Sequence, residues 1–260
     1  MSDFLNPAWR APLTANGLDS FDVLWNLQAP WFDEPNHARG GWSGVARIEI
    51  GSAAGMEHGF FLKRQENYRI FSWRHPVRGI PTLLREFRLI LRYRAAGIAT
   101  VDPVYFAMRF TAKGHRAILI TVALDGFAPL DAYVAGWPTQ GRPAPAERRR
   151  VLTAVADLTR RIHDRHIQHN CYYPKHIFVR VGADGDVEAR VIDLEKSRWR
   201  PARIFCAQRD LDTLNRHSPD WSRTDRLRFL KTYLGIAHLT PYGKWLWRRL
   251  AARAARKTRA

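Results

Sequence analysis

The chain has 260 residues, of which 46% are hydrophobic, so it can bury a sizeable core and does not have the composition of a disordered protein. Its 42 Lys and Arg outnumber its 24 Asp and Glu, and the net charge of +18 favours an anionic partner. Its two cysteines, Cys171 and Cys206, exclude a disulfide framework and a four-thiolate metal site, which predicts an intracellular protein.

The first ten residues, MSDFLNPAWR, lack the basic and apolar pattern of a secretory signal, and no apolar run is long enough to span a bilayer. We therefore expect a cytoplasmic protein that, where it meets a membrane, lies on the surface. Residues 1–37 are rich in Trp, Pro, Asn and Asp without a clear period, so we expect an irregular N-terminal extension.

A predicted β-hairpin follows this extension. One strand begins among the glycines of RGGWSGVARIEI, and the second is EHGFFLKRQE, with the turn GSAAGM between them. Residues 80–97 have helical apolar spacing, with Pro81 in the first turn and Gly97 at the end. Two strands, at 103–110 and 115–124, then meet at a turn near Lys113.

The second half of the chain is mostly helical by pattern. Residues 125–145 are a connector, and residues 146–167 form a long amphipathic helix. A hairpin of 176–181 and 187–194 comes next, and the remainder is helical. These elements predict an α+β protein of two lobes with a cleft between them: the extension 1–37, an N-lobe at 38–124 and a C-lobe at 125–260.

Three charged residues have the types that phosphoryl transfer requires, namely a cation for phosphate and carboxylates for Mg²⁺, and their order along the chain is more informative than any one of them. Lys63 lies in a strand between apolar residues, and Glu86 lies on the following helix, where it could hold the ammonium group. Asp193 ends the apolar run VIDL, and a carboxylate drawn inward by such neighbours needs a partner.

The segment HNCYYPKHIFV, followed by VIDLEKSR, resembles the lipopolysaccharide kinase family of the protein-kinase-like superfamily, which includes core heptose and Kdo kinases and InaA-type relatives. The resemblance covers roughly residues 40–215. It implies a bilobal kinase-like fold that uses ATP and Mg²⁺.

The resemblance also implies roles for single residues. Lys63 would contact the nucleotide phosphates and pair with Glu86. Gly41 and Gly44 would lie in a loop that covers the phosphates. GGWSG is not the kinase glycine pattern, however, and an ordinary turn is the alternative. Asp193 would bind metal, although Leu194 and Glu195 replace the usual Phe and Gly. His176 would be the second metal ligand, and Asp210 would brace the catalytic loop.

Asn170 departs from the family pattern, because it occupies the position of the catalytic Asp and lies one residue farther from His176 than usual. An amide can orient a hydroxyl but cannot take its proton. Three interpretations stay open: the protein binds nucleotide without turnover, Asp164 replaces the missing acid, or Asn170 suffices for a loose transition state.

Two further patterns have competing interpretations. His163, His166 and His169 suggest a metal cluster, but contacts with carbonyls at a helix end explain them better. The basic C-terminal helix GKWLWRRLAARAARKTRA could adsorb to an anionic membrane through Trp245, Leu246, Leu250 and Ala254, or pack within the C-lobe.

Three functions follow from these features. The leading hypothesis is an ATP-dependent kinase that phosphorylates a sugar hydroxyl of the lipopolysaccharide core at the cytoplasmic face of the inner membrane. The second is a pseudokinase that binds nucleotide or an anionic glycolipid. Nucleic acid is the least favoured partner, because the basic residues are spread along the chain and form no known motif.

Overall fold

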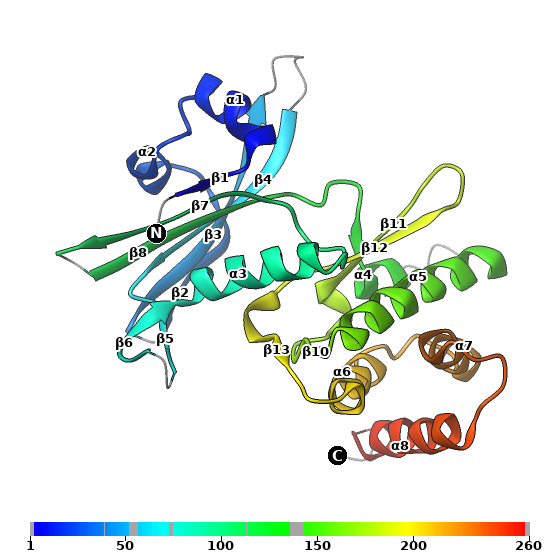
Figure 1. The fold of residues 1–260 in the computed structure, drawn as a ribbon. Coiled ribbons are helices and arrows are strands. Elements are labelled where there is room, and N and C mark those ends of the chain that lie inside the picture. The colour runs from blue at the N-terminus through cyan, green and yellow to red at the C-terminus, as the bar shows by residue number, and fades with distance from the viewer. Residues whose placement is uncertain are drawn as a thin grey trace. The chain divides into compact units, whose positions relative to one another are not determined.

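A computed structural model describes residues 3–38, 40–51, 57–72, 75–112, 114–135 and 143–257 (Figure 1). The chain divides into two compact units: Met1–Arg92 with Val101–Asp125, and Tyr93–Thr100 with Gly126–Ala260. The first is built on a β-sheet and the second is mainly helical, which confirms the α+β prediction. The GSAAGM turn and the turn at Lys113 fall largely outside the described residues, as does the later part of the predicted connector.

The first unit contains a six-stranded antiparallel sheet in the order β1-β7-β8-β4-β3-β2. Its strands are β1 (Phe4–Leu5), β2 (Trp31–Ala38), β3 (Gly41–Gly51), β4 (Glu57–Glu66), β7 (Pro103–Thr111) and β8 (Gly114–Val122). The alternation in β4 determines what each face of this sheet carries. Leu62 is fully buried on one face, and Lys63 projects from the other because successive side chains point to opposite sides.

Residues 1–37 are not irregular, so that expectation is wrong. Helices α1 (Pro7–Ala15) and α2 (Phe21–Asn26) are capped by the side chains of Asn6 and Ser20, and their Leu13, Phe21 and Leu24 join the core of the sheet. The helices are too short to show a period in the sequence, and burial of these apolar side chains stabilises them instead. Figure 1 shows both in blue beside the sheet.

Helix α3 (Thr82–Ala95) packs on the face of the sheet that carries Lys63, where Phe87 stacks on Phe106 with ring centroids 4.4 Å apart. The short hairpin β5 (Arg69–Ser72) and β6 (His75–Pro81), which the sequence pattern did not predict, leads into α3. Gly97 ends the helical segment with φ +70°, as expected for a glycine after a helix C-terminus.

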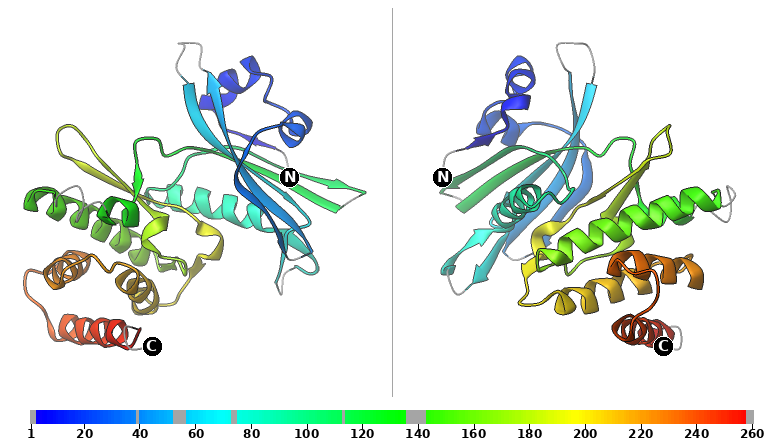
Figure 2. Two further views of the ribbon diagram at one scale, coloured as in Figure 1. Left: turned by 180° about the vertical axis from the view of Figure 1, so that it is seen from behind. Right: turned by 45° about the vertical axis from the view of Figure 1, so that its right-hand side comes forward.

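In the second unit, α5 (Pro145–Asp164) packs against α7 (Arg223–Leu234), and α8 (Pro241–Lys257) packs against α6 (Arg203–Arg216) and α7 (Figure 2). The predicted hairpin is present as β11 (Ile177–Val181) and β12 (Val187–Val191), and β9 (Ala128–Pro129) pairs with β11. Three further short elements are α4 (Leu130–Ala135) and the paired β10 (Ile167–Gln168) and β13 (Arg198–Trp199).

Helix α8 includes residues 243–257 of the basic C-terminal segment and packs within the second unit, which is one of the two alternatives given above. Leu246 and Leu250 are buried, and Trp247 lines an internal cavity, so the leucines expected at a lipid surface lie in the protein interior. Trp245 is exposed, with the Arg249 guanidinium 5.6 Å from the centroid of its ring. In the part of the chain that the structure describes, no helix has the length and apolarity needed to cross a membrane.

Candidate functional site

Lys63 and Glu86 form an ion pair inside the first unit, with Lys63 Nζ 2.5 Å from Glu86 Oε1. The adjacent Gln65 of β4 sets this geometry: its side-chain oxygen accepts the Leu83 N–H, and its amide donates to Thr82 Oγ1. Strand β4 therefore determines where α3 begins, and Glu86 lies one turn later. A buried carboxylate, only 7% exposed, thus holds the lysine side chain in one position.

Gly41 and Gly44 lie in strand β3 rather than in an open loop. A Cβ on Gly41 would lie 1.9 Å from the Glu66 carbonyl oxygen, and a Cβ on Gly44 would lie 2.6 Å from the Trp31 ring. Close packing between strands explains both glycines. Their contact with nucleotide stays a prediction.

Asp210 of α6 holds the predicted catalytic loop in the second unit, as the resemblance implied. The carboxylate is fully buried and accepts the N–H groups of His169 (2.6 Å) and Asn170 (2.9 Å). His163 Nε2 is 3.2 Å from the same group. Two backbone donors and an imidazole therefore satisfy a buried charge, which fixes the loop backbone relative to α6.

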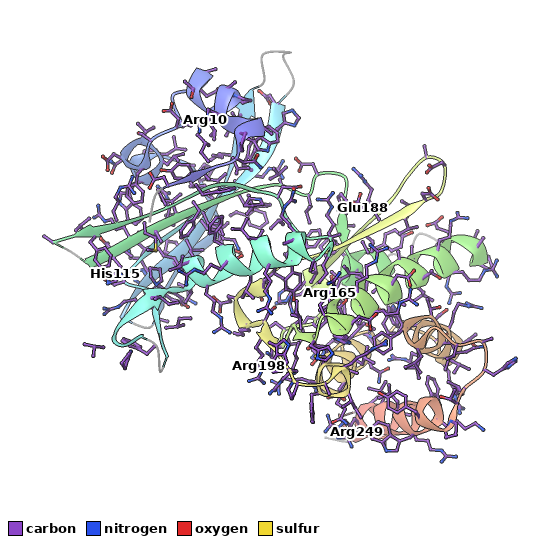
Figure 3. All side chains as sticks on the ribbon, viewed as in Figure 1. Arg10, His115, Arg165, Glu188, Arg198 and Arg249 are labelled. Atoms are coloured by element: carbon purple, nitrogen blue, oxygen red, sulfur yellow. The ribbon has the colours of Figure 1, made fainter. Side chains whose placement is uncertain are left out.

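Asn170 has φ +68°, a left-handed conformation that Asn tolerates better than most residues. Its Nδ2 donates to the Lys196 carbonyl (2.8 Å), and its Oδ1 accepts from Arg198 Nη2 (3.2 Å), with Arg198 labelled in Figure 3. Both ends of the amide are occupied, so Asn170 links the loop to the segment after Asp193. A carboxylate here could keep the arginine contact but could not donate to the carbonyl.

His176 and Asp193 are neighbours: the imidazole Nδ1 is 3.4 Å from Asp193 Oδ2 and 2.8 Å from the Cys171 carbonyl oxygen. Because a carbonyl only accepts, Nδ1 carries the proton, and neutral His176 has its lone pair on Nε2. A metal-binding histidine commonly donates its other N–H to a carbonyl in this way. His176 would therefore bind a metal through Nε2.

The donors fit a magnesium–phosphate complex. Asp193 is accessible and supplies the oxygen ligand that Mg²⁺ prefers, whereas an imidazole nitrogen is the less usual ligand. Among the described residues there is no group of three or more His, Cys, Asp or Glu side chains that could hold a metal. Mg²⁺ is commonly held by one or two protein carboxylates plus substrate phosphates, so these two ligands suffice only together with a bound phosphate.

Asp193 adopts φ +59°, and this turn directs its side chain into an open hollow that His176, Lys175 and Lys196 also line. Burial raises the pKa of the nearby Cys171 thiol, which keeps it protonated and unreactive. The hollow therefore offers a metal ligand pair and two ammonium groups to an anion.

The remaining sequence candidates have structural partners. His163 Nδ1 is 3.0 Å from the Tyr233 hydroxyl, and His169 Nε2 is 3.0 Å from the Ile192 carbonyl oxygen. Burial lowers the pKa of His169, so it is neutral in the folded protein. Asp164 pairs with Arg203 Nη1 at 3.0 Å, at the end of α5, so its carboxylate is already engaged with a guanidinium group.

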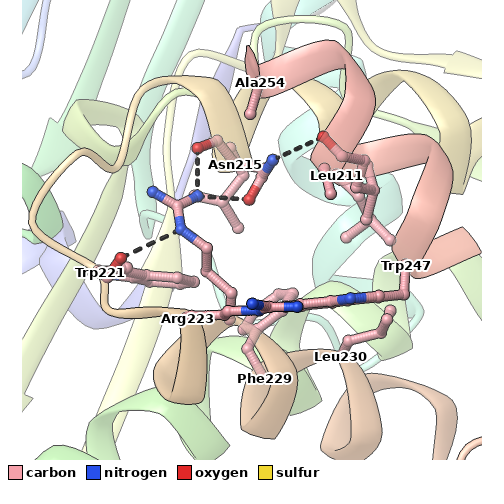
Figure 4. A pocket seen from close by; sticks show the side chains of 12 residues that line it. Leu211, Asn215, Trp221, Arg223, Phe229, Leu230, Trp247 and Ala254 are labelled. Carbon is pink, nitrogen blue, oxygen red and sulfur yellow. Dashed lines mark hydrogen bonds between the residues drawn. The ribbon is translucent and has the colours of Figure 1, made fainter.

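A separate apolar cavity of about 320 Å³ lies among α6, α7 and α8 (Figure 4). Leu214, Trp221, Phe229 and Trp247 contribute to its wall. Arg226 closes one side by donating to the Asn215 and Trp221 carbonyls at 2.6 and 3.1 Å. The sequence predicted helices here and an apolar face on the last of them, but it did not predict a cavity between these helices.

Three comparisons show what this chain is similar to. A model of the "Lipopolysaccharide kinase (Kdo/WaaP) family" matches residues 22–233. Protein InaA of Escherichia coli (strain K12) is 31% identical over 214 residues, which cover 79% of this chain and 93% of InaA. Lipopolysaccharide core heptose(I) kinase WaaP of the same strain is 27% identical over 175 residues, 64% of each chain. A solved structure of WaaP in complex with acyl carrier protein matches with a TM-score of 0.68 and 25% identity, covering 100% of this chain and 97% of that one.

Proposed function

Because the chain belongs to the lipopolysaccharide kinase (Kdo/WaaP) family, we propose that it is an ATP-dependent kinase that phosphorylates a sugar hydroxyl of the lipopolysaccharide core. The observation that carries the proposal is the Lys63–Glu86 pair, an oriented cation of the kind that phosphoryl-transfer enzymes direct at nucleotide phosphates. The proposed location is the cytoplasmic face of the inner membrane.

In this proposal the residues have distinct tasks. Lys63 binds the nucleotide phosphates, and Glu86 keeps its ammonium group in position. Asp193 and His176 would hold Mg²⁺, which would supply positive charge to the phosphates. Asn170 orients the attacking hydroxyl through the second hydrogen of its Nδ2, the first being donated to the Lys196 carbonyl. The proton of that hydroxyl leaves late in a loose transition state and needs no strong base at this position.

Asn170 also supports a second candidate, a pseudokinase that binds nucleotide or an anionic glycolipid without turnover. Its amide is held by Lys196 and Arg198 and has no capacity to accept a proton as a base. Nucleotide binding would then serve conformational control rather than chemistry.

Two measurements test these candidates. Mg-ATP should raise the unfolding temperature of the intact chain, because a ligand that binds only the folded state stabilises it. Transfer of the γ-phosphate to purified core glycolipid, with Asp193→Ala as control, then separates the kinase from the pseudokinase. Absence of both effects would contradict both candidates.

The solved structure that resembles this chain is a complex of WaaP with acyl carrier protein. We propose that an acyl carrier protein binds at the apolar cavity among α6, α7 and α8 and inserts its acyl chain, since the cavity wall is apolar and about 320 Å³ is a ligand-sized volume. Acylated carrier protein should bind more tightly than the unacylated form, and Leu214→Trp, which fills the cavity, should abolish that difference. Equal binding of the two forms would contradict the proposal.

A further inference from the structure

A polar hollow of about 380 Å³ lies beside Asn170 in the second unit, and four arginines line it. Arg200 follows β13, Arg209 and Arg216 lie on α6, and Arg253 lies on α8. We call this hollow the arginine pocket. Its volume is within the range of ligand sites, about 300–1,000 Å³.

The arginine pocket adjoins the hollow that contains His176 and Asp193, because Tyr173 and Arg216 line both. Asn170 lines the arginine pocket itself. A molecule bound there would therefore lie next to the residue at the catalytic position and close to the candidate metal ligands. A phosphate acceptor must occupy such a place.

Positive charge in the pocket exceeds negative charge. Asp212 supplies the single carboxylate among the lining residues, and its Oδ2 is 3.2 Å from Arg216 Nε and 3.3 Å from Arg253 Nη1. Arg200 donates to Gln168, which is uncharged. Arg209 is exposed and, within the described part of the chain, forms no ion pair. Guanidinium groups of this kind bind phosphate or carboxylate by paired hydrogen bonds.

Two buried polar atoms in the wall have no hydrogen-bond partner among the described residues: Gln168 Nε2, a donor, and Asp212 Oδ1, an acceptor. Gln168 is 1% exposed and Asp212 is 6% exposed. Neither atom is accessible to solvent, so a ligand reaches them only when these two side chains turn toward the pocket. Because buried polar groups are normally satisfied, a ligand that both accepts and donates would favour that turn. A sugar hydroxyl does both.

An aromatic platform completes the pocket. Phe205 is 51% exposed although it is a large apolar side chain, and Tyr173 lies in the same wall. Rings of this kind provide flat apolar area against which the C–H face of a sugar can pack. Arginines alone would fit any anion, but the orphaned donor and acceptor together with the rings favour a carbohydrate.

We propose that the arginine pocket binds the acceptor sugar, and that this sugar carries an anionic group. Arg209 would hold the phosphate or carboxylate, while Gln168 Nε2 and Asp212 Oδ1 would bind ring hydroxyls. The inference deepens the proposed kinase function and rests on it for the identity of the bound sugar as an acceptor. It also assigns the C-terminal helix α8 to the substrate site through Arg253.

The test is calorimetric titration of the full chain with lipid-free, phosphorylated core oligosaccharide. Arg209→Gln should weaken binding at least tenfold, because a charged hydrogen bond is lost. Gln168→Glu keeps the acceptor for Arg200 but replaces the orphaned donor with a negative charge, and it should weaken binding similarly. The matched control is Arg161→Gln on α5, the same change at an exposed arginine outside the pocket, which should alter affinity less than twofold.

Equal weakening by Arg209→Gln and Arg161→Gln would overturn the proposal, because it would show a response to net charge alone. Failure of the wild-type chain to bind the oligosaccharide would also overturn it. Treating the oligosaccharide with a phosphatase distinguishes the two possible anionic groups. Loss of binding identifies a sugar phosphate, and retained binding identifies a sugar carboxylate. Either result agrees with the proposal that the bound sugar is anionic.

The kinase function and the arginine pocket can be contradicted independently of each other. Specific binding of the oligosaccharide without γ-phosphate transfer would support the pocket and contradict the kinase. Transfer to a glycolipid that is unaffected by Arg209→Gln and Gln168→Glu would support the kinase and contradict the pocket. The Mg-ATP thermal shift, which does not depend on the arginine pocket, should be the same in the wild type and in these variants.

Discussion

Replacing Asp210 with Asn should release the loop that carries Asn170. The carboxylate accepts three hydrogen bonds in a fully buried position, from the two loop amides and from His163. In Asp210→Asn one oxygen becomes an NH₂ group, so at least one N–H of the loop faces another donor. An unsatisfied buried donor costs about 1–3 kcal/mol, and each bond that loses its charge loses roughly 1 kcal/mol.

The sum is about 3–5 kcal/mol, a large part of the roughly 5–15 kcal/mol that stabilises a typical domain. Urea unfolding at fixed pH measures this loss, and hydrogen exchange at the amides of His169 and Asn170 should accelerate with it. The matched control, Asp220→Asn at an exposed position, should change stability by less than about 0.5 kcal/mol. An Asp210→Asn effect as small as that of the control would refute the role of Asp210 as the brace of the loop.

Three further changes have defined outcomes. Lys63→Met should weaken Mg-ATP at least tenfold in a thermal-shift titration, because an oriented cation is lost from the phosphates. Asn170→Asp should leave single-turnover phosphate transfer unchanged or lower, because the proposed transition state needs no base at this position, and should cost about 1–2 kcal/mol of folding free energy because the Lys196 carbonyl loses its donor. Burial alone would raise the pKa of Asp225, but hydrogen bonds from Ser222 and Arg148 outweigh it and lower that pKa. The stability that Asp225 contributes is therefore complete above the unfolded pKa of about 3.9 and is lost as the pH falls through the lower folded-state pKa.

For each of these changes, one result would contradict the expectation. Unchanged Mg-ATP affinity in Lys63→Met would show that the Lys63–Glu86 pair only joins β4 to α3. A transfer rate raised about 100-fold in Asn170→Asp would contradict the proposed mechanism, because it would show that the missing carboxylate limits catalysis. Arg148→Gln should weaken the acid dependence of the unfolding free energy, and the same slope in wild type and variant would contradict the assignment to Asp225.

Much of the fold was predictable because its long elements have a clear period. The apolar spacing of α3 and α5 and the alternation of β4, β7 and β8 predicted those elements and the α+β class. The helices at Pro7–Ala15 and Phe21–Asn26 were missed, since helices of this length depend on packing against a sheet that local sequence cannot show.

The site was predictable in part for a similar reason. Lys63, Glu86, His176, Asp193 and Asp210 follow a chain order that resembles a family, and order is visible in sequence. The partners of Asn170, namely the Lys196 carbonyl and Arg198, lie more than twenty residues away and have no motif of their own. The sequence left open whether the basic tail that contains Arg253 adsorbs to a membrane or packs in the C-lobe, whereas the hydrogen bond from Arg253 to Asp212 places it in the wall of the arginine pocket.

The sequence by itself determined the α+β class of the protein and the presence of Asn170 where the family pattern has an acid, and its net charge predicted an anionic partner. These depend on composition, period and order, which are properties of the chain. The tertiary structure alone decided that Gln168 and Asp212, which line one pocket, leave a buried donor and a buried acceptor without a partner among the described residues. It did so because hydrogen-bond satisfaction depends on which atoms packing brings within about 3 Å, and residue type does not specify that distance.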